Sequence, residues 1–100
     1  MRSLLTVSFL AFQNLLHMHV KPLRNDLLRY IKKRGLTKKF SKQLTLLTDN
    51  PRHPSLNTEI LEPKKLRLYS FRVDRKYRAI FILMTHDEAE IVDINDHYQR

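Results

Sequence analysis

Arg78 is the side chain of this sequence whose surroundings point most clearly to chemistry. It is the single charge in an apolar stretch that runs from Tyr77 to Met84. A charge inside a central strand costs free energy unless it is paired or faces an open site. Because a guanidinium binds phosphate oxygens in a bidentate manner, Arg78 is a candidate phosphate clamp. The alternative is a structural ion pair with Asp93 on a neighbouring strand.

Other kinds of catalytic site find little support in the sequence. His17 and His19 form an H-x-H pair, but no third ligand follows at a suitable spacing. Asp93 and Asp96 lie near His97, in a grouping that is common in solvated turns. A glycine-rich phosphate loop and a serine or cysteine nucleophile triad are both missing. We therefore expect no metal and no cofactor.

The charge balance predicts a negatively charged partner. The sequence has 19 Lys and Arg against 10 Asp and Glu, which gives a net charge of +9. Such a surface attracts phosphate backbones, although it also suits an acidic protein. The absence of Cys excludes disulfides and thiolate metal sites, so a cytoplasmic location fits. No apolar run reaches the length that spans a bilayer, and we expect no membrane contact.

Two helices joined by a short turn are predicted before residue 50. Gly35, the single glycine of the chain, falls where a helix ends in a left-handed residue. Thr37 is the expected N-cap of the second helix, and Asn50-Pro51 ends it. Much of the excess positive charge lies on this hairpin. The charged side chains form either a binding surface or an ordinary solvated surface. The apolar residues at helical spacing are Leu23, Leu27, Tyr30 and Ile31, then Leu36, Phe40, Leu44 and Leu47.

Three strands are predicted after the helices, over residues 66–73, 77–84 and 90–95. His19 and Val20 are expected to add a short edge strand in front. Helices segregated from an antiparallel sheet define an α+β fold, here an N-terminal helical hairpin packed on an antiparallel β-sheet. One sheet face is expected to cover the helices. The other is expected to present Ser70, Arg72, Arg78 and His97, and in the last strand Val92 and Ile94 are expected to share one face.

Three motifs give the sequence a family resemblance. They are NPRHPSL at residues 50–56, YSFRVDRKYRAIF at 69–81 and IVDINDHY at 91–98. With the helical hairpin before them, they make residues 18–100 resemble the RelE/ParE superfamily of toxins from bacterial toxin–antitoxin pairs. The resemblance implies two helices against a twisted antiparallel sheet. It also implies one of two activities, since RelE-like members cleave mRNA in the ribosomal A site without a metal, whereas ParE-like members poison DNA gyrase.

The resemblance also implies roles for individual residues in RNA cleavage. Arg78 matches the arginine that contacts the scissile phosphate. His97 and Tyr98 match a C-terminal His-Tyr pair in which histidine is the general acid, and histidine exchanges protons near neutral pH. Glu59 lies at about the place of the candidate general base, with Glu62 as a rival.

Further residues are implied to bind RNA. Arg72 and Ser70 stand where RelE carries two lysines, and of these Arg72 alone supplies positive charge. Lys64, Lys65 and Arg67 form a basic run that is expected beside the site, where it would contact RNA phosphates.

The function expected from these features is that of a type II toxin. We expect a metal-independent, ribosome-dependent mRNA endonuclease that inhibits translation. The alternatives are a ParE-like gyrase poison, and a catalytically inactive module that binds an antitoxin or RNA. The expected partners are a cognate antitoxin encoded by an adjacent gene, mRNA on the ribosome, and operator DNA reached through the antitoxin.

Residues 1–17 fall outside the family resemblance and are expected to be an N-terminal extension. The apolar stretch from Leu4 to Phe12 has the outline of a signal peptide but lacks a small-residue cleavage site. A short core strand or helix is a second interpretation. A third, which we favour, is that translation starts at Met18 and that residues 18–100 form a single toxin domain.

Overall fold

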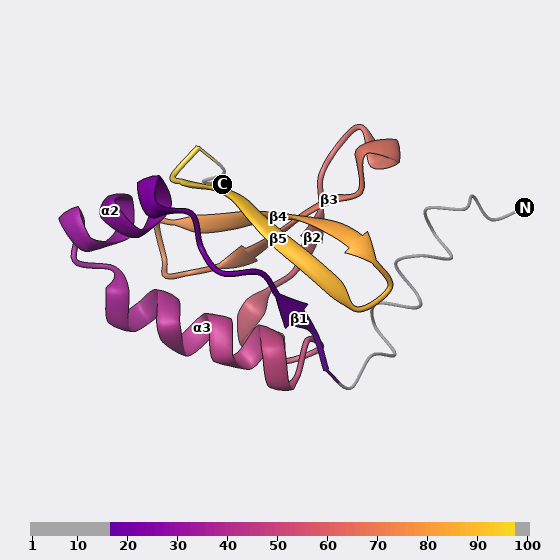
Figure 1. The fold of residues 1–100 in the computed structure, drawn as a ribbon, viewed down its shortest axis with the longest axis horizontal. Coiled ribbons are helices and arrows are strands. Elements are labelled where there is room, and N and C mark those ends of the chain that lie inside the picture. The colour runs from indigo at the N-terminus through magenta and orange to yellow at the C-terminus, as the bar shows by residue number, and fades with distance from the viewer. Residues whose placement is uncertain (1–16, 98–100) are drawn as a thin grey trace, which may run out of the picture.

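Five strands form one mixed sheet in the computed structural model, which describes residues 17–97 (Figure 1). Neighbouring strands are antiparallel except for the first and last in sequence, which are parallel. The α+β fold predicted from the sequence is confirmed, with one parallel edge in the sheet. The order across the sheet is β1 (His19–Val20), β5 (Glu88–Asn95), β4 (Arg78–Thr85), β3 (Leu68–Arg72) and β2 (Glu59–Ile60).

The short strand β2 has no counterpart in the sequence prediction. It pairs with β3, so that Glu59 lies opposite Ser70 and Ile60 lies opposite Tyr69. A strand of two residues is too short to show alternation, and the sequence around it reads as irregular. The 3-10 turns η1 (Pro54–Leu56) and η2 (Lys64–Leu66) lie on either side of it in sequence.

The helices α2 (Asn25–Lys33) and α3 (Thr37–Asp49) form the predicted hairpin. Gly35 between them has a φ of +67°, in the left-handed region that glycine adopts most easily, as predicted. The predicted N-cap role of Thr37 is wrong, because Thr37 is already the first helical residue. The capping position belongs to Leu36, which is 3% exposed and has no side-chain acceptor. The residue before this helix therefore belongs to the hydrophobic core and does not cap the helix through its side chain.

The hydrophobic core lies between the helices and one face of the sheet. Leu27 of α2 and Phe40 of α3 are at most 4% exposed. Phe40 lies beside Phe71, and Tyr69 stacks on Phe81 with 5.4 Å between ring centroids. Full burial of one such side chain stabilises the fold by about 1.5–3 kcal/mol.

Met18, the second of the described residues, belongs to the hydrophobic core. Met18 is fully buried, and its backbone N–H donates to the carbonyl of Thr48 at 2.9 Å. The N–H of His19 then donates to the carbonyl of Asp87, which anchors β1 beside β5. The predicted extension, residues 1–17, lies outside the described residues except for His17.

The last strand, β5, contains a β-bulge at Val92. On β4, Ile80 lies opposite Asp93, whereas the next residue, Phe81, lies opposite Ile91. Val92 is therefore an extra residue in β5. A bulge of this kind turns the residues beyond it toward the other face of the sheet.

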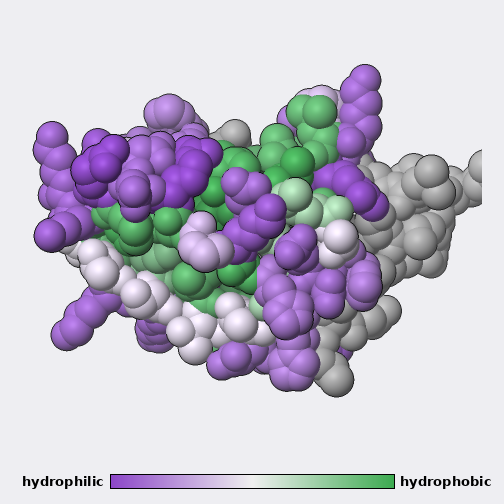
Figure 2. Space-filling model, in the orientation of Figure 1, coloured by the Kyte–Doolittle hydropathy of each residue, from purple (hydrophilic) through white to green (hydrophobic). Residues whose placement is uncertain are grey.

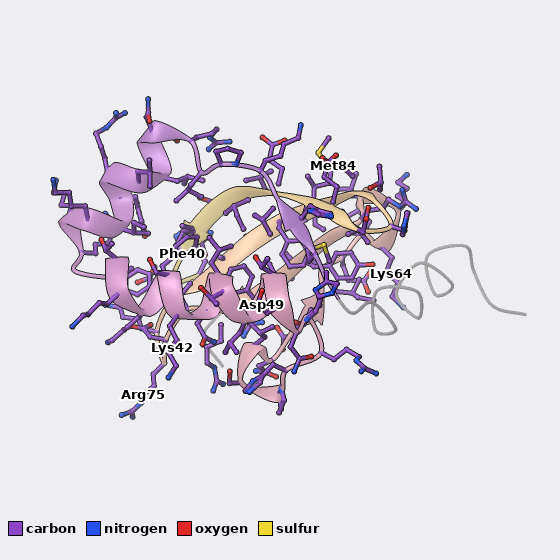
Figure 3. The ribbon with its side chains drawn as sticks, turned by 60° about the horizontal axis from the view of Figure 1, so that its bottom comes forward. Phe40, Lys42, Asp49, Lys64, Arg75 and Met84 are labelled. Atoms are coloured by element: carbon purple, nitrogen blue, oxygen red, sulfur yellow. The ribbon has the colours of Figure 1, made fainter. Side chains whose placement is uncertain are left out.

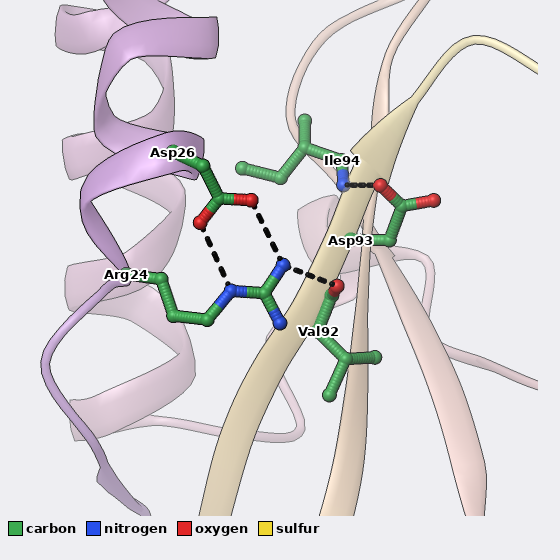
Figure 4. A network of polar contacts seen from close by, with 5 residues as sticks. All are labelled: Arg24, Asp26, Val92, Asp93 and Ile94. Atoms are coloured by element: carbon green, nitrogen blue, oxygen red, sulfur yellow. Dashed lines mark hydrogen bonds and ion pairs between the residues drawn. The ribbon is translucent and has the colours of Figure 1, made fainter.

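The bulge overturns one expectation about β5. Ile94 is 1% exposed and belongs to the core, while Val92 is half-buried outside it. The predicted shared face of Val92 and Ile94 is therefore wrong. Figure 4 shows Arg24, held by Asp26 in a two-bond ion pair, donating from Nη2 to the carbonyl of Val92 at 3.2 Å. Arg24 thus ties the start of α2 to the bulge.

Candidate active site

The candidate site lies on the sheet face turned away from the helices. Residues directly opposite each other in paired strands point to the same face. Cross-strand pairing therefore places two adjacent rows of side chains there. The first row is Glu59, Ser70, Ile80 and Asp93, and the second is Arg72, Arg78 and Asn95.

The Arg78 side chain is buried and lies across β3. Its Nε donates to Ser70 Oγ at 2.9 Å, and its Nη2 donates to the Ser70 carbonyl at 3.1 Å. Nη2 also donates to the carbonyl of Asn57 at 2.6 Å. Asn57 has a left-handed φ of 45° and lies two residues before Glu59, the first residue of β2. The guanidinium is therefore fixed against both β3 and the segment that leads into β2.

Glu59 is the carboxylate that the structure brings to Arg78. Its Oε1 lies 3.8 Å from Nη2 of Arg78, and its side chain is 29% exposed against 9% for Arg78. Asp93, the partner considered from the sequence, lies opposite Ile80 and accepts a hydrogen bond from Asn95 instead. The ion pair considered as the alternative for Arg78 thus forms with β2 rather than with β5.

The two candidate bases differ in their surroundings. Glu59 lies in the same row as Ser70, beside Arg78. Glu62 is exposed and lies in the loop between β2 and η2. In this arrangement Glu59 is the carboxylate that can reach a phosphate bound at Arg78.

The strand that carries His97 ends next to Arg78. Asn95, the last residue of β5, lies directly opposite Arg78. The backbone N–H of His97 donates to Oδ1 of Asn95 at 3.0 Å, and the side chain of His97 is exposed. Tyr98, its predicted partner, lies outside the described residues.

The basic residues predicted to bind RNA fall into two groups. Arg72 is exposed and lies directly opposite Arg78. The run Lys64, Lys65 and Arg67 is not brought to Arg78, because the carbonyl of Arg67 accepts a hydrogen bond from the N–H of Leu83. Leu83 is five residues along β4 from Arg78, which is about 17 Å at the usual rise of a strand. Figure 3 shows Lys64 at one end of the molecule and Arg75, which lies in the turn before β4, toward the other.

Two residues of the site carried no signal of their own in the sequence. Asn57 meets Arg78 through its backbone carbonyl, so its side-chain type says nothing about the contact. The contacts of Asn95 with Asp93 and His97 depend on the bulge in β5 and on the turn that follows it.

The surface of the described part is polar around an apolar area. Figure 2 shows hydrophilic side chains gathered over α2, with hydrophobic surface between them and the loop that leads to β3. Leu66 and Met84, exposed by 48% and 41%, lie at the end of β3 and β4 that is away from Arg78.

Within residues 17–97, no group of three His, Cys, Asp or Glu side chains could hold a metal ion. Neither α2 nor α3 is long and apolar enough to cross a membrane.

The helical hairpin, the sheet order and the match to a toxin family model identify the chain as a toxin of the RelE/ParE superfamily. The chain belongs to the family described as ParE toxin of type II toxin-antitoxin system, parDE, whose family model matches residues 21–100. The resemblance stated from the motifs is thereby confirmed. No curated protein matches the sequence.

Solved structures of similar toxins share the fold. The YoeB dimer from Staphylococcus aureus superposes with a TM-score of 0.55 at 19% identity, over 83% of this chain and 98% of that one. A YoeB/ParE toxin from Agrobacterium tumefaciens gives 0.55 at 14% identity, over 82% and 99%. A heterotetrameric YoeB-YefM toxin-antitoxin complex from Staphylococcus aureus gives 0.52 at 19% identity, over 84% and 99%.

Proposed function

We propose that this toxin is a metal-independent endoribonuclease that cleaves mRNA on the ribosome and so inhibits translation. The observation that supports this most directly is the contact between Arg78 and Glu59 on the open face of the sheet. A buried cation, a carboxylate and a nearby histidine are the groups that RNA cleavage through the 2′-hydroxyl requires.

The proposed chemistry is an in-line transfer at phosphorus. Glu59 takes the proton of the ribose 2′-OH, whose oxygen attacks the adjacent phosphate. His97 then protonates the departing 5′ oxygen, and the products are a 2′,3′-cyclic phosphate end and a 5′-OH end. The attacking and leaving oxygens lie on opposite sides of phosphorus, so a base and an acid must approach from opposite sides. Glu59 on β2 and His97 after β5 flank β3 and β4 in this way.

Positive charge between the base and the acid stabilises the phosphorane. Arg78 and the exposed Arg72 supply it, and both lie on the strands between β2 and β5. Three hydrogen bonds fix the guanidinium of Arg78 before substrate arrives, which reduces the reorganisation that the reaction would otherwise require. We assign Ser70 to this positioning of Arg78, and we propose that Tyr98 takes part in the reaction together with His97.

The other RNA contacts predicted from the sequence are assigned to the edges of the substrate. Arg67, at the end of the run Lys64, Lys65 and Arg67, is bonded to Leu83, about 17 Å along β4 from Arg78, so we propose that this run binds RNA phosphates remote from the cleaved bond. They would strengthen binding without taking part in the chemical step.

A cognate antitoxin is the proposed protein partner. The related YoeB toxin of Staphylococcus aureus is found in a complex with YefM. We expect the antitoxin of this chain to be encoded by an adjacent gene and to carry the complex to operator DNA. Since ribosomes are the target, the toxin acts in the cytoplasm. We also propose that the toxin domain comprises residues 18–100 and that residues 1–17 are an extension.

Gyrase poisoning is the second candidate, because the family that the chain belongs to is described by its ParE toxins. In a gyrase poison, the hydrogen bonds of Arg78 within the protein would have a structural role alone. A catalytically inactive module that binds antitoxin or RNA is the third.

Mapping of RNA ends in cells separates the three candidates. The protein is induced from Met18, and 5′ ends are mapped on a reporter mRNA with and without its start codon. The nuclease predicts cuts in the translated message alone. Growth arrest with DNA damage and no cuts would favour the gyrase poison, and the absence of arrest would favour the inactive module.

A further inference from the structure

Asn95 is a buried polar residue to which the mechanism above gives no role. Its side chain is 7% exposed and lies directly opposite Arg78. Its Nδ2 donates to Oδ2 of Asp93 at 2.7 Å, and its Oδ1 accepts from the backbone N–H of His97 at 3.0 Å. Both ends of the carboxamide are therefore occupied, one by a residue of the strand and one by the turn beyond it.

The bulge at Val92 makes this arrangement possible. Without the extra residue, Asp93 would follow the alternation of Ile91 and face the core. With it, Asp93 turns to the open face, two positions before Asn95. Asp93 is itself fixed, because its Oδ1 accepts a hydrogen bond from the N–H of Ile94 at 2.9 Å (Figure 4).

We propose that Asn95 is a positioning residue that sets where His97 stands relative to Arg78. The inference rests on the proposed function, in which His97 is the general acid. His97 follows the last residue of β5, where the ladder to β4 has ended. The Asn95 Oδ1, rather than a backbone carbonyl of a paired strand, accepts the hydrogen bond from the His97 N–H. This bond closes a turn between Asn95 and His97. The bond to Asp93 prevents the Asn95 carboxamide from rotating. Asp93 therefore holds Asn95, and Asn95 in turn holds the backbone of His97.

Asn95→Ala removes both hydrogen bonds and leaves His97 in the chain. Asn95→Ser is the conservative variant, since a serine hydroxyl accepts from a backbone N–H two residues later. Asn25→Ala, at the exposed first residue of α2, is the matched control. Far-UV circular dichroism and thermal unfolding establish that each variant folds. If Asn95→Ala does not fold, a folded Asn95→Ser that loses the cleavage rate would contradict the inference.

Single-turnover cleavage on programmed ribosomes gives the first readout. A loss of alignment of about 1 Å can cost about 100-fold in rate. Asn95→Ala should therefore lower the rate at saturating ribosome about 10- to 100-fold while half-saturation changes little, and Asn95→Ser should restore much of the rate. In a His97→Ala background, Asn95→Ala should cause no further loss, because both changes act through one group.

Amide hydrogen exchange gives a second readout that does not depend on activity. The His97 N–H should exchange faster in Asn95→Ala than in the wild type, while the Leu83 N–H, bonded to Arg67, should be unchanged. Wild-type rates in Asn95→Ala, or an additive loss in the double variant, would overturn the inference and leave the proposed nuclease intact. A harmless His97→Ala in an active enzyme, or a wild type that cuts no RNA, would remove the general acid and the inference with it.

Discussion

Nη2 of Arg78 and Oε1 of Glu59 lie 3.8 Å apart, across the short strand pairing of β2 with β3. A pair at this distance attracts without forming a hydrogen bond, and the glutamate side remains partly open to solvent. Under the proposed function, the phosphate of the substrate contacts Arg78 while the Glu59 carboxylate reaches the ribose. This geometry explains why a strand of two residues matters to the site.

Ser70→Ala tests the positioning of Arg78. The change removes the acceptor of the Arg78 Nε and leaves the cation and the fold of β3 in place. We expect a loss of about 1–3 kcal/mol in the free energy of unfolding, because a buried donor loses its partner. The cleavage rate should fall about tenfold or more through misalignment of the guanidinium. Urea unfolding and single-turnover cleavage measure the two effects, and an unchanged rate would show that Ser70 has no bearing on the reaction.

Glu59→Gln and Glu62→Gln distinguish the two candidate bases. Both changes remove one negative charge and keep the side-chain shape. Glu59→Gln should lower the rate at saturation about 100-fold or more, as the loss of a general base does, whereas Glu62→Gln should leave it near the wild-type value. The reverse result would assign the base to the loop before η2.

Arg72 and the remote basic run should differ in the kinetic constant that they affect. Arg72→Gln removes a cation opposite Arg78, so the rate at saturation should fall about tenfold or more. Lys64→Gln together with Lys65→Gln should weaken RNA binding and its salt dependence, with the saturated rate almost unchanged. Titrations at two salt concentrations measure both effects, and equal losses of saturated rate would contradict the separation seen along the sheet.

Asp74 predicts a specific acid sensitivity of folding. Burial alone would raise the pKa of Asp74, but the amides of Tyr77 and Lys76 donate to it and Lys39 pairs with it, so its pKa lies below the ordinary 3.8. A lowered pKa means that this carboxylate stabilises the fold fully above about pH 4 and stops doing so as pH falls through the folded-state value.

Asp74→Asn keeps an acceptor in the turn and removes the charge. The wild type should therefore be more stable than the variant at pH 6, and the difference should shrink below about pH 4. Urea unfolding across this range measures it, with Asp49→Asn at the exposed end of α3 as the control. A constant difference down to pH 2 would show that the charge of Asp74 contributes nothing.

Local patterns in the sequence predicted most of the fold. The spacing of residues such as Leu27 and Phe40 and the single Gly35 were sufficient for the helical hairpin, because a helix is defined by contacts within one turn. The alternation within residues 66–73 likewise predicts the face of the sheet on which Ser70 and Arg72 lie.

The features that the sequence did not reveal depend on pairing between distant segments. The residues around Val92 alternate in the sequence as in a strand without a bulge. The bulge is recognised only from the register of β5 against Ile80 and Phe81 of β4. The alternative interpretation of Arg78 is an ion pair with Asp93 on an adjacent strand, whereas the structure pairs Arg78 with Glu59, in a segment without a recognisable pattern. Arg78 itself was found because a lone charge in an apolar strand is a local signal.

The most direct test of the account is cleavage by purified protein on ribosomes that carry a defined codon in the A site. Wild type, Arg78→Lys and Arg78→Ala are compared under single-turnover conditions, with unfolding measured alongside. We expect cleavage by the wild type, with 2′,3′-cyclic phosphate and 5′-OH ends. The rate should fall about 100- to 1000-fold in Arg78→Ala, with a smaller loss in Arg78→Lys, because removing one transition-state contact has this effect. Full activity in a folded Arg78→Ala, or no cleavage by the wild type, would contradict the assignment of this site as a nuclease.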